Sequence, residues 1–168
     1  MVRLVDGPTV ELDVYVAAPC ARVWALVSDI TVPTRFGGEL YEAEWLDGAT
    51  GPAVGATFVG RNRNELLGQW ETVSRIADHR PERAFGWDVR GFKGGFDRPV
   101  ARWRLDLEPE GDGTRLRHSV TLGAGSSYLS RAIAAEPGRE EEIMALRLGM
   151  LRQGMRTTLD GIRRLAEA

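Results

Sequence analysis

Seven short segments of alternating apolar and polar residues, followed by one long amphipathic segment, constrain the fold of this 168-residue chain most strongly. The first segment, VELDVYV at 10–16, places its four apolar side chains on one face. The other six follow at near-regular spacing, at 40–48, 55–63, 68–79, 83–91, 100–109 and 114–123. Alternation with a period of two is typical of strands that bury one face. Short connections, such as the turn at Asp47-Gly48, favour an antiparallel meander.

Three segments have helical spacing instead. Residues 18–30 read APCARVWALVSDI, in which Pro19 suits a first helical turn, and a second short helical piece is expected over 31–36. Residues 137–168 repeat apolar side chains every three to five residues, with glutamates first and arginines last, as the helix dipole favours. Only this long helix can cover the apolar face of a meander. We therefore predict an α+β helix-grip fold: a seven-stranded curved antiparallel sheet wrapped around a long C-terminal helix, with two short helices after the first strand, in a single domain, 1–168.

The predicted inner face carries large aromatic side chains and a few polar ones. Gly149, Gly154 and Gly161 interrupt the long helix, and a mid-helix glycine costs about 1 kcal/mol relative to alanine. Close backbone approach or space for a ligand would explain them, and the alternative is that the aromatic residues simply fill the core. The predicted ligand-binding residues are Tyr41, Trp45, Phe58, Asn62, Trp70, Phe85, Trp87, Trp103, His118, Met150 and Gly154.

His118 is the one histidine on a predicted apolar strand face, and its imidazole can act as a general acid or base. The alternative is a core histidine that hydrogen-bonds a backbone or side-chain partner. The Asn62 amide can orient a ligand carbonyl, or it can make a structural hydrogen bond within the sheet. His79 precedes Arg80 and Pro81, so we expect it in an exposed turn.

Composition argues against several classes of function. The chain has 22 basic and 24 acidic residues, a net charge of -2, so no basic surface for nucleic acid is predicted. One cysteine and two histidines predict no metal site, and the missing phosphate-binding motifs predict no cofactor. No apolar run reaches the length of a membrane span, so we expect no integral membrane association and a cytoplasmic protein. A homodimer through the C-terminal helix stays open.

Alternate loops of a meander lie at the same end, so residues 63–69, 91–99 and 123–138 are expected to cluster. The second of these loops carries Phe92 and Phe96 among glycines, and SSYLSRAIAAEP within the third predicts a short amphipathic helix. We expect this end to be the mouth of an internal cavity, with the loops as its gate. The alternative is a set of ordinary hairpin loops.

Several segments together resemble a known family over nearly the whole chain. They are APCARVWALVSDI, EWLDGATGPAVGATFVGRNR, WETVSRIADHRPERAFGW, PVARWRLDLEPEGDGTRLRHS and RLGMLRQGMRTTLDGIRRLAE. The chain resembles the SRPBCC (START/Bet v 1-like) superfamily, specifically bacterial proteins of the polyketide cyclase/dehydrase and lipid-transport-like type. The resemblance implies a cavity for an apolar or aromatic small molecule.

Fold alone does not fix an activity, so three functions are carried forward. The first is a carrier or sensor that binds such a molecule. The second is a cyclase/dehydratase-type enzyme that uses His118 as general acid or base. The third is an interaction protein whose sheet or lid binds another protein.

Overall fold

A computed structural model describes residues 1–65 and 67–168 of the chain, and in them one sheet and three α-helices form a single layered unit. The strands are β1 (Thr9–Val16), β2 (Leu40–Trp45), β3 (Thr57–Asn64), β4 (Gly68–Arg80), β5 (Ala84–Val89), β6 (Ala101–Glu110) and β7 (Gly113–Leu122). The helices are α1 (Cys20–Val27), α2 (Tyr128–Ala135) and α3 (Glu140–Glu167), with 3-10 turns η1 (Leu4–Asp6), η2 (Val32–Arg35), η3 (Gly95–Asp97) and η4 (Pro137–Arg139).

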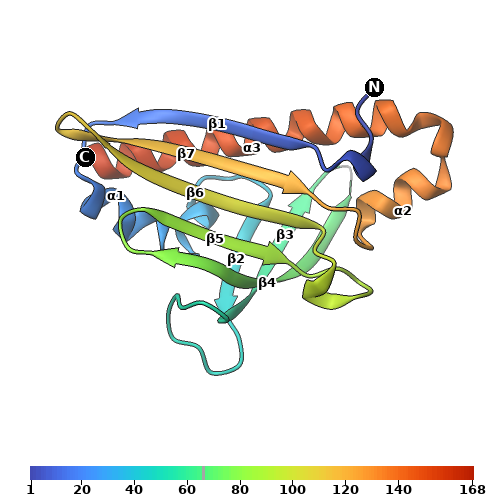
Figure 1. The fold of residues 1–168 in the computed structure, drawn as a ribbon, viewed down its shortest axis with the longest axis horizontal. Helices are drawn as coiled ribbons and strands as arrows, with labels where there is room; N and C mark the ends of the chain where they lie inside the picture. The colour runs from blue at the N-terminus through green and yellow to red at the C-terminus, as the bar shows by residue number, and fades with distance from the viewer. Residues whose placement is uncertain (66) are drawn as a thin grey trace.

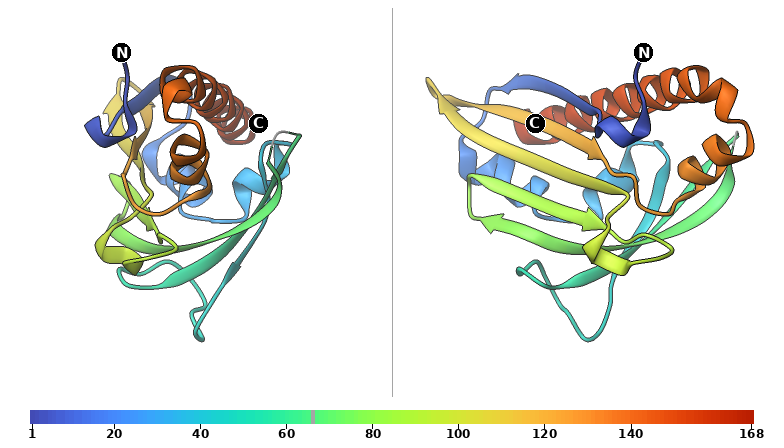
Figure 2. Two further views of the ribbon diagram at one scale, coloured as in Figure 1. Left: turned by 90° about the vertical axis from the view of Figure 1, so that its right-hand side faces the viewer. Right: turned by 45° about the vertical axis from the view of Figure 1, so that its right-hand side comes forward.

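The sheet is antiparallel throughout, in the order β1-β7-β6-β5-β4-β3-β2 (Figure 1). Viewed along the long axis of the molecule, it curls into a U with α3 across the open side (Figure 2, left). The helix lies mainly along β1 and also touches α1, η2 and β7. This arrangement confirms the predicted helix-grip fold and its seven-stranded sheet.

The short helices follow local sequence signals. α1 begins directly after Pro19, and the Thr114 hydroxyl donates to the Ala18 carbonyl, which ties this helix start to β7. The second predicted helical piece is the 3-10 turn η2. Ser127 and Ser130 form a capping box at the start of α2, the predicted lid helix. α3 starts at Glu140 rather than Pro137, because η4 occupies the first three positions.

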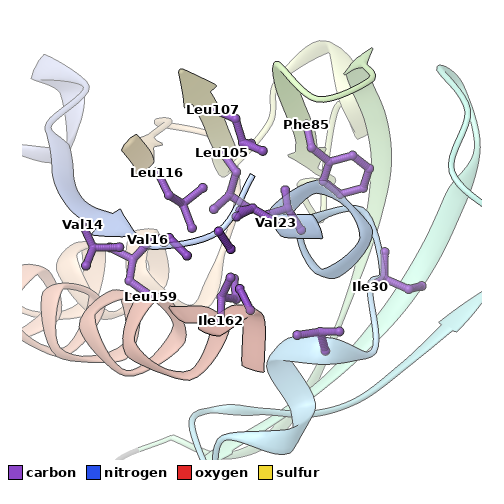
Figure 3. Packing of buried hydrophobic residues seen from close by; sticks show 14 of the residues in the cluster. Val14, Val16, Val23, Ile30, Phe85, Leu105, Leu107, Leu116, Leu159 and Ile162 are labelled. Atoms are coloured by element: carbon purple, nitrogen blue, oxygen red, sulfur yellow. The ribbon is translucent and has the colours of Figure 1, made fainter. Parts of the chain in front are cut away.

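Two hydrophobic cores lie at the two ends of the inner face. The first joins α1, the C-terminal half of α3 and the strands above them, and includes Val16, Val23, Phe85, Leu116 and Leu159 (Figure 3). The second joins the N-terminal half of α3 to β1 and β7, and includes Val10, Val120, Met144, Leu151 and Met155. Leu12 and Trp87 contact both cores, so the middle of the inner face lies between them.

Two bulges change which side chains face inward. Tyr41 is an extra residue in β2, since Leu40 pairs with Asn62 while Glu42 pairs with Arg61. Ala77 is an extra residue in β4, since Ile76 pairs with Trp87 and Asp78 with Gly86. A single inserted residue moves the following side chains to the other face.

Candidate functional site on the inner face of the sheet

A continuous row of five aromatic rings crosses the inner face from β2 to β7. Trp45 contacts Phe58 at 5.8 Å between ring centroids, and Phe58 contacts Trp87 at 6.1 Å. Trp87 stacks nearly parallel to Trp103 at 6.2 Å, and Trp103 contacts the His118 imidazole at 5.3 Å. Paired strands bring large side chains of one face within reach of each other, and the Phe58 and Trp87 rings meet across β4, which lies between their strands.

The tryptophans of this face are not fully covered. Trp45, Trp70, Trp87 and Trp103 are only half-buried, whereas Phe58 and Phe85 are buried beneath them. The helix does not seal the face, because α3 packs chiefly on β1. At Gly154 of α3, an added Cβ would meet no atom within 4 Å. The half-buried tryptophans therefore leave accessible aromatic surface on the face that the fold turns inward.

The internal cavity expected from the sequence stays a prediction. Two open hollows, of about 290 and 370 Å³, lie elsewhere in the described structure. One is lined by Arg98, Arg102 and residues 121–125, and the other flanks the β3–β4 turn. The candidate site is thus the inward-turned aromatic face, defined by its half-buried rings.

Tyr41 does not belong to this face, which corrects the sequence prediction. The Arg63 guanidinium lies 4.6 Å from the centre of the Tyr41 ring, and Arg63 is exposed on the outer side of β3. Leu40 takes the inward position instead, with its Cδ1 3.0 Å from where a Gly60 Cβ would stand. Period-two reading missed the exchange because the bulge at Tyr41 breaks the alternation.

His118 lies at the deep end of the row and is 5% exposed. Its cross-strand neighbours are Leu12 and Leu105. Neither imidazole nitrogen has a hydrogen-bond partner among the described residues. His118 is therefore not the hydrogen-bonded core histidine that the sequence left open as an alternative. Burial lowers the pKa of His118 to about 4, and the imidazole is therefore neutral at neutral pH.

The second histidine is also placed differently from the prediction. His79 lies on β4, which runs to Arg80, rather than in a turn. The bulge at Ala77 turns its side chain inward, opposite Phe85. Its ring is half-buried and contacts Trp24 of α1 at 5.4 Å and Phe85 at 6.3 Å. His79 therefore packs against the end of the first core.

The remaining predicted residues divide between sheet and helix. The Asn62 amide donates to the Gly60 carbonyl at 3.3 Å and lies 3.5 Å from the Thr72 hydroxyl, which matches the structural alternative. Trp70 pairs with Asn62 on the inner side of β4. Met150 is half-buried on α3, one turn before Gly154.

The loops that were predicted to form the mouth of the cavity come together only in part. Phe92 stacks edge-on against Tyr128 at 5.0 Å, and its backbone N–H donates to the Ser126 carbonyl, so the β5–β6 loop contacts the start of α2. Phe96 instead lies under the exposed Arg75 guanidinium, at 4.4 Å. Residue 66 of the predicted 63–69 loop lies outside the described residues.

An ion pair between α3 and the residue before β2 was not predicted from the sequence. We call this edge of the inner face, at Glu39 and Arg147, the rim. Arg147 of α3 donates to both Glu39 carboxylate oxygens, at 2.7 and 3.3 Å, and the Asn64 amide donates to the same carboxylate at 3.1 Å. Arg147 and Glu39 are 108 positions apart, so no local pattern could reveal the pair. It links the helix to the strand edge on the open side of the inner face.

No group of three or more His, Cys, Asp or Glu side chains within 1–65 and 67–168 is placed to hold a metal ion. Over the same residues, none of the helices combines the length and the apolar character that crossing a membrane requires.

A curved sheet closed by a long helix around an aromatic face defines a helix-grip protein of the SRPBCC type. The chain belongs to the family described as polyketide cyclase / dehydrase and lipid transport, which it matches over residues 8–167. None of the curated proteins compared with the chain matches it.

Solved structures share the fold. A polyketide-cyclase-like protein from Corynebacterium glutamicum is 33% identical, with a TM-score of 0.61 over 94% of this chain and 90% of the other. A Thermus thermophilus protein is 16% identical, with a TM-score of 0.65 over 95% and 97% of the two chains. The di-domain ARO/CYC BexL of the BE-7585A biosynthetic pathway is 15% identical, with a TM-score of 0.70 over 96% of this chain and half of BexL.

Proposed function

We propose that the chain binds an apolar or aromatic small molecule on the inner face of its sheet, as a carrier or sensor does. The observation that carries this proposal is the row of half-buried tryptophans on a face that the fold turns inward. Large aromatic side chains left accessible to solvent lose the stabilisation that full burial would give them. A flat apolar molecule laid against Trp87 and Trp103 would recover it.

The chemistry of the face fits this class of ligand. Ligand sites are mostly apolar and carry a few polar groups that fix orientation. Here the apolar part is the aromatic row, and the polar group at its end is His118. The family description, polyketide cyclase / dehydrase and lipid transport, supports a small hydrophobic ligand. Cytoplasmic location and a homodimer stay predictions from the sequence.

A fluorescent probe tests the proposal directly. N-phenyl-1-naphthylamine is neutral and brightens in apolar surroundings, so titration of the purified protein should give saturable binding. Trp87→Leu removes the central ring of the row and should weaken binding about tenfold or more. Tyr41→Ala removes an aromatic ring from the outer face and should leave binding unchanged. Equal binding by all three proteins, or none by the parent, would contradict the proposal.

The second candidate is a cyclase/dehydratase-type enzyme with His118 as general acid or base. A neutral imidazole at the end of an aromatic face favours it, and BexL, an ARO/CYC, has the same fold. However, a general base must come within hydrogen-bonding distance of the proton that it removes, and both His118 nitrogens are buried. Incubation with a poly-β-ketone substrate tests this candidate: turnover that falls by orders of magnitude in His118→Leu would establish the enzyme.

A further inference from the structure

We propose that His118 is the hydrogen-bonding anchor of the site, and that it selects a neutral aromatic ligand carrying a hydroxyl group, a phenol or an enol. This inference rests on the proposed function, because it names the chemical class of molecule that the aromatic face accepts. It assigns His118 a role in recognition that holds whether or not a reaction follows.

The described residues around His118 are apolar and offer its two nitrogens no hydrogen-bond partner. Leu12 and Leu105 flank it across the strands, and Leu116 and Val120 are the next inward residues on β7. A neutral imidazole always has one N–H donor and one nitrogen acceptor. Leaving both buried without a partner destabilises the folded protein, so a leucine at this position would fold more stably.

The ligand class follows from what a neutral imidazole can satisfy. Neither His118 nitrogen has a hydrogen-bond partner among the described residues, and burial lowers the pKa of the imidazole. A carboxylate brought here would lose its hydration without a charge partner. A carbonyl can only accept from the N–H, whereas a hydroxyl can donate to the nitrogen lone pair or accept from the N–H. A neutral hydroxyl on a flat ring is therefore the best match.

Trp103 lies where such a ligand would have to approach. Its ring stands between His118, at 5.3 Å, and Trp87, at 6.2 Å, and it is itself half-buried. A turn of the Trp103 side chain would uncover the imidazole toward the solvent-accessible part of the face. The ligand ring would then lie against Trp87 and the displaced Trp103 indole, with its hydroxyl on His118.

Three probes of one shape and different polar groups test this recognition. Naphthalene, 2-naphthol and 2-naphthoate differ only in carrying no polar group, a hydroxyl or a carboxylate. Each competes against N-phenyl-1-naphthylamine for the parent protein, His118→Leu and His118→Gln. In the parent, 2-naphthol should bind about tenfold more tightly than naphthalene, as one buried hydrogen bond predicts, and 2-naphthoate should bind most weakly.

The variants separate recognition from structure. His118→Leu should lose the preference for 2-naphthol, keep naphthalene binding and melt at a higher temperature than the parent. His118→Gln keeps a donor and an acceptor, so it should retain part of the preference.

The possible results have distinct meanings. The anchor is supported if the parent binds 2-naphthol more tightly than naphthalene and His118→Leu loses this preference. Equal affinities for naphthalene and 2-naphthol in the parent, or an unchanged preference in His118→Leu, would overturn the anchor and leave the proposed binding function standing. Tightest binding of 2-naphthoate would overturn the neutral ligand class. If the parent binds neither the fluorescent probe nor the naphthalenes, the proposed function fails, and the anchor with it.

Discussion

The Arg147 guanidinium of α3 donates hydrogen bonds of 2.7 and 3.3 Å to the two carboxylate oxygens of Glu39, just before β2. The two side chains are 20% and 27% exposed, and the pair joins α3 to the strand edge at the open side of the inner face. We expect the pair to keep α3 close to the start of β2.

Arg147→Met should therefore loosen the rim more than it destabilises the fold. We expect a loss of unfolding free energy of about 1 kcal/mol or less, typical of such ion pairs, with faster hydrogen exchange over residues 36–40. Release of N-phenyl-1-naphthylamine, followed by stopped flow, should be several-fold faster. Arg139→Met is the matched control, because the described partners of Arg139 are the exposed and nearby Glu136 and Glu142. If N-phenyl-1-naphthylamine leaves both variants at the same rate, the Arg147–Glu39 pair does not control release of the ligand.

Two helix glycines should respond in opposite directions to alanine. A Cβ at Gly161 would stand 2.5 Å from the Phe36 ring, so Gly161→Ala forces η2 away from α3 and should cost about 1–3 kcal/mol. Gly149 is exposed with no atom within 4 Å of the added Cβ, and Gly149→Ala should gain about 1 kcal/mol from helix propensity. Urea unfolding of both variants measures the difference, and equal shifts would contradict the close packing at Gly161.

The buried imidazole predicts a pH dependence of stability. The pKa of His118 is lowered from 6.5 to about 4 by burial, so between these values the unfolded chain binds more protons than the folded one. Unfolding free energy should therefore fall as pH decreases from 6.5 toward 4, by roughly 3 kcal/mol in total, and this contribution is constant above 6.5. His118→Leu should lack this component. Carboxylates such as Asp78, whose pKa is lowered by Arg80 and Arg104, contribute equally to both proteins. Parallel pH curves for parent and variant would contradict the prediction.

The two phenylalanines of the β5–β6 loop should differ as gate residues. Phe92 is 45% exposed and contacts Tyr128 and Arg131 of α2, whereas Phe96 stacks under Arg75. Phe92→Ala should change the association rate of N-phenyl-1-naphthylamine by several-fold, while Phe96→Ala should leave it unchanged. Identical rates in the parent and both variants would remove the loop from ligand entry.

Much of the fold was predictable because it depends on local patterns. Strand positions follow from alternation, and α3 follows from apolar spacing and the glutamates of its first turn, such as Glu140. The inner-face placement of Trp87 and Trp103 was predictable for the same reason, since β5 and β6 pair without a bulge there. The candidate site was predicted less completely. Tyr41 and His79 were assigned to the wrong surroundings because one extra residue in β2 and one in β4 reverse the alternation.

The sequence by itself determined the secondary structure, the order of elements and the aromatic character of the inner face. These depend on the spacing of apolar side chains along the chain and on turn residues between them. The tertiary structure decided how far α3 covers the sheet, which groups close its rim and whether His118 has a partner. Each of these depends on contacts between different elements, such as Glu39 with Arg147 or Trp103 with His118, which are set by sheet curvature and strand register.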